Sequence, residues 1–318
     1  MKLSKFHIWI PRLSILGAAT GILFVLFGRL FAPFDIFAHF TPHFAIILFS
    51  GCLAEIFQNR AMPILAIGAV ATLGIHPAIA TWNNGGEWTR AAQAATADPS
   101  SDQNPARLKV ISLNSWHSHP APGAIGEFIK RENPDLVVLL EFGPNKRTLL
   151  NQLQNTYPYK ADCSERWHCS VAVLSKRPIS AHGSGGPETT IPAHAWITVK
   201  VDGQDFTIIG AHMHRPIDGM NRHRRQLIGL SKLAKKISGA VLVTGDFNTT
   251  RWADSYNLFA KVSGLTPMQG YLPTWPAQFP QLAIDHMFHN YKARVTHAKT
   301  APTLGSDHLP LIASVRFD

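Results

Sequence analysis

The sequence predicts an α/β domain preceded by a membrane anchor of three helices. Two observations support this. The N-terminal third contains three long stretches with almost no charged side chains. After residue 106, short runs rich in Val, Ile and Leu alternate with segments of helical pattern, which is the order of elements in an α/β protein. A chain of 318 residues has room for both parts.

Each of the three apolar stretches approaches the roughly 20 residues that cross a bilayer as a helix. We expect these helices at about 13–31, 36–56 and 61–82. The first stretch alone could be a secretory signal peptide, but the two that follow so closely favour an anchor at 1–82. Residues 83–106 are rich in Gly, Ala, Ser, Asn and Pro and predict a flexible linker.

Basic residues set the expected orientation of the anchor. Lys2, Lys5 and Arg12 precede the first apolar stretch, and Arg60 lies between the second and the third. The positive-inside rule then places the N-terminus in the cytoplasm. Three crossings would put the domain at 107–318 on the outer face of the membrane.

Three histidines lie within the expected spans, at His39, His43 and His76. Ionisable residues inside a membrane are functional candidates by default. Because these three are scattered along the sequence, we expect them to be neutral, hydrogen-bonded packing residues.

Positive charge is concentrated in the second part of the chain. Residues 1–106 carry six Lys/Arg and five Asp/Glu, which leaves 24 and 15 for residues 107–318. The second part therefore has a net charge of +9 of the total +10. A basic domain favours an anionic partner, which could be a phosphate ester, nucleic acid or an acidic lipid surface.

Two cysteines lie close together in the expected domain. Cys163 and Cys169 stand between probable strands at 157–161 and 170–175. A disulfide between them is plausible in an oxidising compartment. With His168 the two thiolates could instead hold a metal ion, but no fourth soft ligand is evident nearby, which favours the disulfide.

Polar residues mark the ends of the expected strands. Strand patterns occur at 108–113, 135–140, 206–213, 241–245, 284–288 and 311–317, and helical patterns at 124–132, 218–238 and 254–262. The residues at or just beyond the strand ends are Asn114, Glu141, His212, Asp246, Asn248, Asp285, Asp307 and His308. We expect them to form one site at an edge of the sheets. The basic residues of the 218–238 helix are interpreted as its solvated face.

The stretch from Val241 to Asn248 is the most informative of these. A β-branched run reaches Gly245 and then places a carboxylate and an amide two residues apart, at Asp246 and Asn248. In extended backbone, positions i and i+2 point the same way. This suits a general base and an amide that orients its water or holds a phosphate oxygen, although a surface turn uses the same residue types.

The motifs occur in the order of a known family. They are LN at 113–114, LLE at 139–141, AHMHRP at 211–216, GDFN at 245–248, IDH at 284–286 and SDHLP at 306–310. Together they resemble the endonuclease/exonuclease/phosphatase superfamily. The resemblance implies a four-layer sandwich of two mixed β-sheets flanked by helices, with the site at one edge of the sandwich.

The resemblance also implies a divalent metal. Glu141 would bind it, with Asn114 and Asp307 helping. Such oxygen-rich ligands suit Mg²⁺ or Mn²⁺ better than zinc. Relatives often carry a further acid or amide after the position of Asn114, whereas this chain has Ser115, Trp116 and His117. The resemblance therefore implies one metal and leaves a second position unassigned.

The remaining roles follow from the same resemblance. Asp246 would activate the attacking water, and Asn248 would hold the water or a phosphate oxygen. His308, paired with Asp285, and His212 would stabilise charge on the phosphoryl group. For substrate binding the expected residues are Trp275, Arg215 and His214, the last at a position where relatives commonly have Pro or an apolar residue, so that it is either a substrate contact or has no role.

A narrower resemblance concerns the whole architecture. An anchor of three spans, a linker, GDFN followed by Thr249 and Trp252, and the sequence Thr274–Trp275–Pro276 are similar to a membrane-anchored bacterial branch. That branch includes undecaprenyl-diphosphate phosphatases linked to glycopeptide resistance.

We therefore expect a multi-pass protein of the bacterial inner membrane that hydrolyses a lipid-linked phosphate outside the cytoplasm, with no obligate protein partner. A membrane-tethered nuclease and a non-catalytic receptor or scaffold are the alternatives.

Overall fold

The structure is a computed structural model that describes residues 3–28, 30–57, 107–118, 123–142, 147–163 and 169–317. The chain divides into two compact units. The first contains the N-terminal helices together with Arg251–Asp254, and the second contains the two β-sheets. Each unit is considered by itself.

The first unit begins with α1 (Leu3–Phe27). Its segment Trp9–Phe27 has a mean hydropathy of 1.9 and is long and apolar enough to cross a membrane. The 3₁₀ turn η1 (Ala32–Phe34), α2 (Asp35–Ala38) and α3 (Thr41–Phe57) follow. Among the described residues, α1 is the one unbroken helix that meets these criteria, which by themselves are weak evidence for a span.

The prediction of one continuous helix at about 36–56 is wrong. The structure breaks it after Ala38, and the two segments on either side are bent by 61°. Pro42 lies at the start of α3, where its missing N–H is tolerated, and it disfavours helical backbone at the preceding residue. The bent pair counts as a second span only if both segments are taken together. The expected helix at 61–82 and the linker at 83–106 lie outside the described residues.

Helices α1 and α3 pack against each other through a small apolar cluster of Ala18, Ile22 and Leu48. Near their other ends, Arg12 Nε donates to Glu55 Oε1 at 3.2 Å. The histidines of this region are expected to be packing residues, and His43 is in contact with an aromatic ring. The ring of His43 lies edge-on to that of Phe40, with 5.8 Å between centroids. His76 lies outside the described residues.

The second unit contains two six-stranded sheets. Sheet A has the order β11–β12–β1–β2–β4–β3, and sheet B has the order β5–β6–β7–β8–β10–β9. The strands of sheet A are β1 (Arg107–Asn114), β2 (Leu136–Leu140), β3 (Tyr159–Asp162), β4 (Val171–Ser175), β11 (Ala293–Thr300) and β12 (Leu311–Phe317). Those of sheet B are β5 (Ile179–Gly185), β6 (Ala193–Val201), β7 (Gln204–His212), β8 (Ala240–Asp246), β9 (Thr266–Pro267) and β10 (Asp285–His289).

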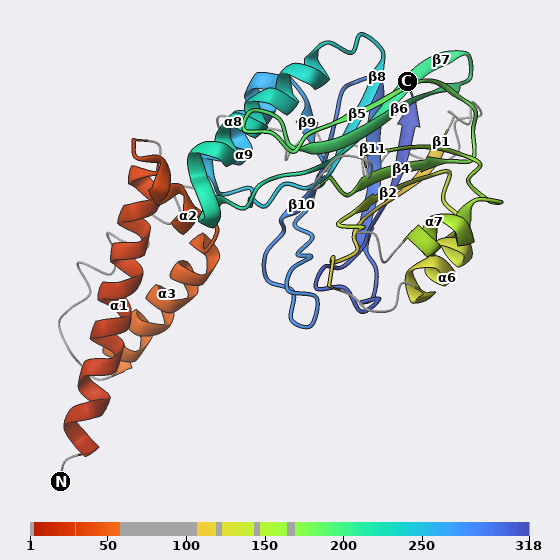
Figure 1. Cartoon of the computed structure of the whole chain (residues 1–318). Helices are drawn as coiled ribbons and strands as arrows, with labels where there is room; N and C mark the ends of the chain where they lie inside the picture. The colour runs from red at the N-terminus through yellow and green to blue at the C-terminus, as the bar shows by residue number, and fades with distance from the viewer. Residues whose placement is uncertain are drawn as a thin grey trace, which may run out of the picture. The chain divides into compact units, whose positions relative to one another are not determined.

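Both sheets are mixed, because β1 runs parallel to β2 and β7 runs parallel to β8, whereas the other pairs are antiparallel. Helices cover the outer faces of the sheets (Figure 1). They are α6 (Gly123–Glu132) and α7 (Arg147–Leu153) on sheet A, and α8 (Pro216–Lys235) and α9 (Asp254–Ser263) on sheet B. The expected pair of mixed sheets flanked by helices is therefore confirmed.

Strand β2 shows why an uninterrupted apolar run is needed. Val138 and Leu140 point between the sheets, whereas Val137 and Leu139 point toward α6 and α7. Because successive side chains of a strand point to opposite faces, a strand covered on both sides has no polar position. The sheets approach closely at Gly210 of β7, where an added Cβ would lie 2.5 Å from Val138 Cγ1.

Cys163 and Cys169 are joined by a disulfide in the structure, and both are buried. The backbone N–H of Val171 donates to Cys163 Sγ at 3.3 Å. The bridge therefore closes the connection between β3 and β4.

The expected helix at 218–238 has different ends from those observed. The structure begins α8 at Pro216 and ends it at Lys235, with non-helical backbone at Gly219. Strands β5 and β11, which the sequence patterns did not indicate, are the outer strands of sheets B and A, respectively.

Candidate functional site

The site lies where strands of both sheets end. In sheet B, His212 of β7 pairs with Asp246 of β8, and Asp246 pairs with Asp285 of β10. In sheet A, Asn114 ends β1 beside the last residue of β2, and Glu141 follows directly. The predicted residues are therefore assembled by strand register from two sheets.

Glycine at position 245 is required for this register. Gly245 has a φ of 142°, and a Cβ at this position would overlap the carbonyl oxygen of Ala211 in the neighbouring strand. Only glycine tolerates both conditions. The Gly in GDFN therefore allows β8 to carry Asp246 into place beside β7.

Three non-glycine residues at the site have left-handed backbone. The φ angles are 54° at Trp116, 51° at Glu141 and 48° at Asn248. Such conformations cost free energy and persist where surrounding contacts hold them, which is common at functional sites. Here they turn the chain sharply just after β1, β2 and β8.

Glu141 is held by four contacts from three residues. Asn114 Nδ2 donates to Oε1 at 3.0 Å, and the backbone N–H and ring Nδ1 of His117 contact Oε2 at 3.0 and 2.8 Å. His212 Nε2 lies 3.5 Å from Oε1. Burial alone would raise the pKa of this carboxyl group, but His212 and these hydrogen bonds outweigh it and hold the pKa at about 2. Glu141 is therefore an anion at neutral pH.

Asp246 is almost completely buried and lies at the centre of the site. Asn114 Nδ2 donates to its Oδ2 at 3.1 Å, and the backbone N–H of Asn248 donates to its Oδ1 at 2.8 Å. Burial, together with the nearby carboxylate of Asp285, raises the pKa of Asp246 to about 6 against the opposing effect of His308 and His212. A carboxylate whose pKa approaches neutrality suits a general base.

His308 and Asp285 form a pair beside Asp246. His308 Nδ1 lies 2.8 Å from Asp285 Oδ2, and Thr274 Oγ1 donates to the same oxygen at 2.6 Å. Burial would lower the pKa of His308, but Asp285, Asp246 and Asp307 outweigh it and raise the pKa to about 10. His308 is therefore a cation at neutral pH. Its Nε2 faces Asp246 Oδ2 at 3.7 Å.

Asn248 binds back to the neighbouring strand end. Its Nδ2 donates to the carbonyl oxygen of Met213 at 3.0 Å, while the N–H of Met213 donates to the carbonyl oxygen of Asp246 at 2.9 Å. These contacts fix the GDFN turn against the segment that carries His212 and His214.

Asp307 follows a serine that ties the loop between β11 and β12 to the end of β1. Ser306 Oγ donates to the carbonyl oxygen of Asn114 at 2.7 Å and accepts the N–H of His308 at 3.1 Å. Asp307 Oδ1 is buried and has no hydrogen-bond partner among the described residues. A buried carboxylate oxygen without a donor is costly unless a cation or water satisfies it.

Two overlapping groups have donor atoms within 4.8 Å of one another, one of Glu141, His212 and Asp246 and the other of Asp246, Asp285 and His308. A protonated His308 has no free lone pair, so the first group is the better metal site at neutral pH. Its two carboxylates fit a hard divalent cation. The structure does not bring Asp307 into either group, and its free Oδ1 is a further oxygen donor close by.

The three residues expected to bind substrate have different surroundings. Trp275 is 37% exposed and is adjacent to Thr274, which holds Asp285. Arg215 Nε is occupied by Asp218 Oδ2 at 2.7 Å, and its side chain is exposed. His214 is held by its backbone, because its N–H donates to Gln226 Oε1 and its carbonyl oxygen lies 2.7 Å from His223 Nδ1.

Four residues that support the site had no assigned role in the sequence motifs. They are His117, Thr274, Ser306 and Gln226, and each contacts a predicted residue or its backbone. The Thr–Trp–Pro sequence drew attention to Thr274 without indicating its partner. Ser306 begins the SDHLP motif, which does not indicate its partner, and His117 and Gln226 have partners 24 and 12 residues away in the chain.

Comparison with known proteins agrees with the fold and the motifs. Residues 111–308, more than half of the chain, match the model of the Endonuclease/Exonuclease/phosphatase family. The chain belongs to this family, whose members are hydrolases of phosphate esters and phosphodiesters. A curated relative is UPF0294 protein VP2298 of Vibrio parahaemolyticus, which is 28% identical over 154 residues. That match covers 45% of this chain and 53% of the relative, so the chain spans about half the length of that protein.

Solved structures share the fold at low sequence identity. An endonuclease/exonuclease/phosphatase family protein from Bacteroides thetaiotaomicron has a TM-score of 0.55 at 17% identity, covering 67% of this chain and 99% of that one. A humanized D. rerio TDP2 has a TM-score of 0.56 at 16% identity, with coverage of 66% and 99%. A beta toxin variant from Staphylococcus aureus with bound magnesium ions has a TM-score of 0.52 at 18% identity, with coverage of 65% and 99%.

Proposed function

We propose that this protein is a membrane-anchored, divalent-metal-dependent phosphoesterase that hydrolyses a lipid-linked phosphate ester or anhydride. The reaction takes place at the outer face of the bacterial cytoplasmic membrane. The observation that carries the proposal is the cluster in which Asp246, with a raised pKa, lies between an anionic Glu141 and a cationic His308.

The chemistry of the cluster fits attack by water on phosphorus. Asp246 accepts a proton as the water oxygen bonds to phosphorus, and the bond to the leaving oxygen breaks on the opposite side. The Asn248 side chain lies beside this carboxylate and orients the water or a phosphate oxygen. No covalent intermediate is needed, because the carboxylate acts only on the water.

Negative charge that develops on the phosphoryl group is met by the cationic imidazole of His308. His308 presents Nε2 on the side of Asp246, and Asp285 holds the ring by its other nitrogen. His212 lies between Glu141 and Asp246 and contributes a second imidazole. Fixed donors of this kind stabilise a transition state because they need no reorganisation during the reaction.

Within the first group, Glu141 would hold a magnesium or manganese ion, with Asp307 and the oxygen of Asn114 nearby, which leaves Asp246 to act on the water and His212 to face the phosphoryl group. A divalent ion bound there supplies Lewis-acid polarisation of a phosphoryl oxygen. The low pKa of Glu141 keeps a charged oxygen ligand available across the neutral range.

Two features support a membrane-borne substrate. The chain contains a helix long and apolar enough to cross a bilayer, and the domain that follows carries most of the positive charge. A domain tethered to a membrane meets membrane-borne substrate at a high effective concentration. A basic surface is also attracted to anionic headgroups.

The test is phosphate release from undecaprenyl diphosphate by the full-length protein in detergent, with magnesium and with a chelator. Asp246→Asn serves as the inactive variant, and Asp205→Asn, which removes an exposed carboxylate of β7, serves as the matched control. Magnesium-dependent release by the wild type and the control, but not by Asp246→Asn, is the expected result.

Parallel reactions contain supercoiled plasmid, because a basic domain of this fold could also bind a nucleic acid backbone. Plasmid nicking without phosphate release would replace the proposal with a tethered nuclease. No turnover of either substrate, with or without magnesium, would favour a non-catalytic scaffold and contradict the proposal.

A further inference from the structure

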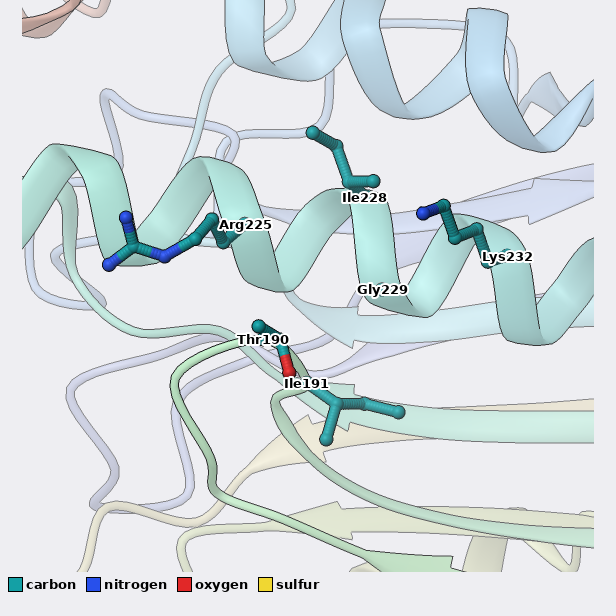
Figure 2. A pocket seen from close by; sticks show the side chains of 6 residues that line it. All are labelled: Thr190, Ile191, Arg225, Ile228, Gly229 and Lys232. Atoms are coloured by element: carbon teal, nitrogen blue, oxygen red, sulfur yellow. The ribbon is translucent and has the colours of Figure 1, made fainter.

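A second basic feature lies outside the catalytic cluster, on helix α8. A groove of about 460 Å³ runs between α8 and the chain segment before β6. It is lined by Thr190, Ile191, Arg225, Ile228, Gly229 and Lys232. Figure 2 shows Arg225 and Lys232 on α8 on either side of Gly229, with Thr190 and Ile191 on the facing segment. None of the catalytic residues lines it.

The groove depends on a close approach of helix and segment. A Cβ at Gly229 would overlap the carbonyl oxygen of Thr190. Because glycine permits this contact, the helix and the segment touch at one point and leave open space along it. The backbone on both sides of the groove is therefore in direct contact at Gly229.

The lining combines two cationic side chains with two apolar ones. Arg225 and Lys232 are exposed, and neither has an ion-pair partner within the described part of the chain. Arg225 and Lys232 are seven positions apart, which corresponds to a rise of about 10 Å along a helix axis. The apolar side chains of the lining are Ile191 and Ile228, and no acidic side chain lines the groove. Such a lining suits a group with an anionic head and apolar carbon atoms next to it.

One side chain connects the groove to the segment that carries His212 and His214. Gln226 follows Arg225, and its Nε2 donates to the carbonyl oxygens of Glu188 and Ile191, at 2.6 and 3.4 Å. Its Oε1 accepts the N–H of His214 at 2.9 Å. The segment that walls the groove and the segment that carries His212 are therefore held by the same buried amide.

We propose that this groove binds the phosphate headgroup of an anionic phospholipid, and so docks the domain on the bilayer surface beside its active site. Arg225 and Lys232 contact the phosphate, the Thr190 hydroxyl donates to it, and the two isoleucines pack against the glycerol and the first acyl carbons. A nucleic acid fits less well, because no aromatic side chain lines the groove for a base to stack on. The inference rests on the proposed membrane location but not on the identity of the substrate.

Lipid binding by the full-length protein in detergent is measured by native mass spectrometry with dioleoyl phosphatidylglycerol. The test variant is Arg225→Gln/Lys232→Gln. The matched control is Lys235→Gln/Lys236→Gln, which removes the same charge from exposed positions at the end of the same helix, outside the groove. Near an anionic surface each cation contributes about fivefold to binding, so we expect about 30-fold weaker binding in the test variant. The control should lose less than about threefold.

Equal loss in both variants would overturn the inference, because net charge would then explain the binding. No loss in either variant would overturn it as well, because Arg225 and Lys232 would then not hold the lipid. Equal binding of dioleoyl phosphatidylcholine would overturn it as well. Displacement of the lipid by inorganic phosphate at the same concentration would identify free phosphate as the ligand and exclude the lipid headgroup. The readout is binding, so headgroup binding without phosphate release in the preceding assay would contradict only the proposed function.

Discussion

The interior of the sandwich and its functional edge are built from the same strands in opposite ways. Between the sheets, β2, β4 and β7 contribute mostly apolar side chains, and every residue of β2 is buried. At the ends of β1, β2, β7, β8 and β10, the same sheets present amides, carboxylates and imidazoles. One strand therefore changes from apolar packing to ionic chemistry within one or two residues.

This difference indicates where the fold is stabilised and where it accepts a cost. The apolar interior removes carbon atoms from water, which is the dominant favourable contribution to folding. The edge buries Asp246 beside Asp285 and holds Glu141 and Asn248 in left-handed backbone. Proteins tolerate such local violations at functional sites because other regions compensate for them.

The largest expected effect is on the pH dependence of folding stability, and it concerns a buried histidine of α8. His223 is fully buried on α8, and burial lowers its pKa to about 4 from an ordinary value of 6.5. The unfolded chain takes up a proton below pH 6.5, whereas the folded chain does so only below about pH 4. Stability therefore falls as the pH decreases through this window, by about 3 kcal/mol.

Urea unfolding between pH 7 and pH 4 measures that slope. His223→Gln should show a loss smaller by about this amount, and His182→Gln, at an exposed position of β5, should behave like the wild type. Parallel slopes for all three proteins would show that His223 does not couple protonation to folding.

The next effect concerns the interior. Gly210→Ala places a methyl group against Val138, where the sheets are closest, and should cost about 2 kcal/mol by overpacking. The double variant with Val138→Ala should recover part of this loss, because the second substitution makes room for the first. The midpoint of urea unfolding measures both. Additive losses in the double variant would contradict the proposed contact.

The smallest effect concerns the edge. Thr274→Val keeps the shape of the side chain but removes the hydroxyl that donates to Asp285. We expect turnover to fall about tenfold, because a hydrogen bond to a charged group is lost and His308 is held less firmly. Thr274→Ser should retain turnover. Thr198→Val, which breaks a hydroxyl pair within sheet B, is the control. Steady-state kinetics measure kcat and KM, and equal losses in Thr274→Val and Thr274→Ser would exclude this role of the hydroxyl.

Much of the fold could be predicted from the sequence where one face or both faces of an element are buried. The runs at β1, β2 and β12 gave strands close to the observed ones, because a covered strand is apolar at successive positions. The outer strands β5 and β11 gave no such pattern, since most of their side chains are exposed or only partly buried. The break before α3 was missed because the apolar composition continues through it.

The residues that the motifs supply were predictable, but not how they are held. Asp246 and Asn248 stand out because both follow a buried strand within one tetrapeptide. His117 and Ser306 reach the site through contacts of 24 and 192 residues in sequence separation, which no local pattern encodes. The groove on α8 was likewise invisible, because its basic residues are also typical of a solvated helix face.

The central claim is that the polar residues at the edge of the sheets lower the stability of the fold and enable hydrolysis of a phosphate ester. Its most direct test is Asp246→Asn in the full-length protein, assayed for turnover and for thermal unfolding without divalent metal. The account predicts that turnover falls by about 1,000-fold, as expected for loss of a general base, while the unfolding temperature stays the same or rises, because a buried charge beside Asp285 has been removed. Retained turnover, or a variant that no longer folds, would contradict it.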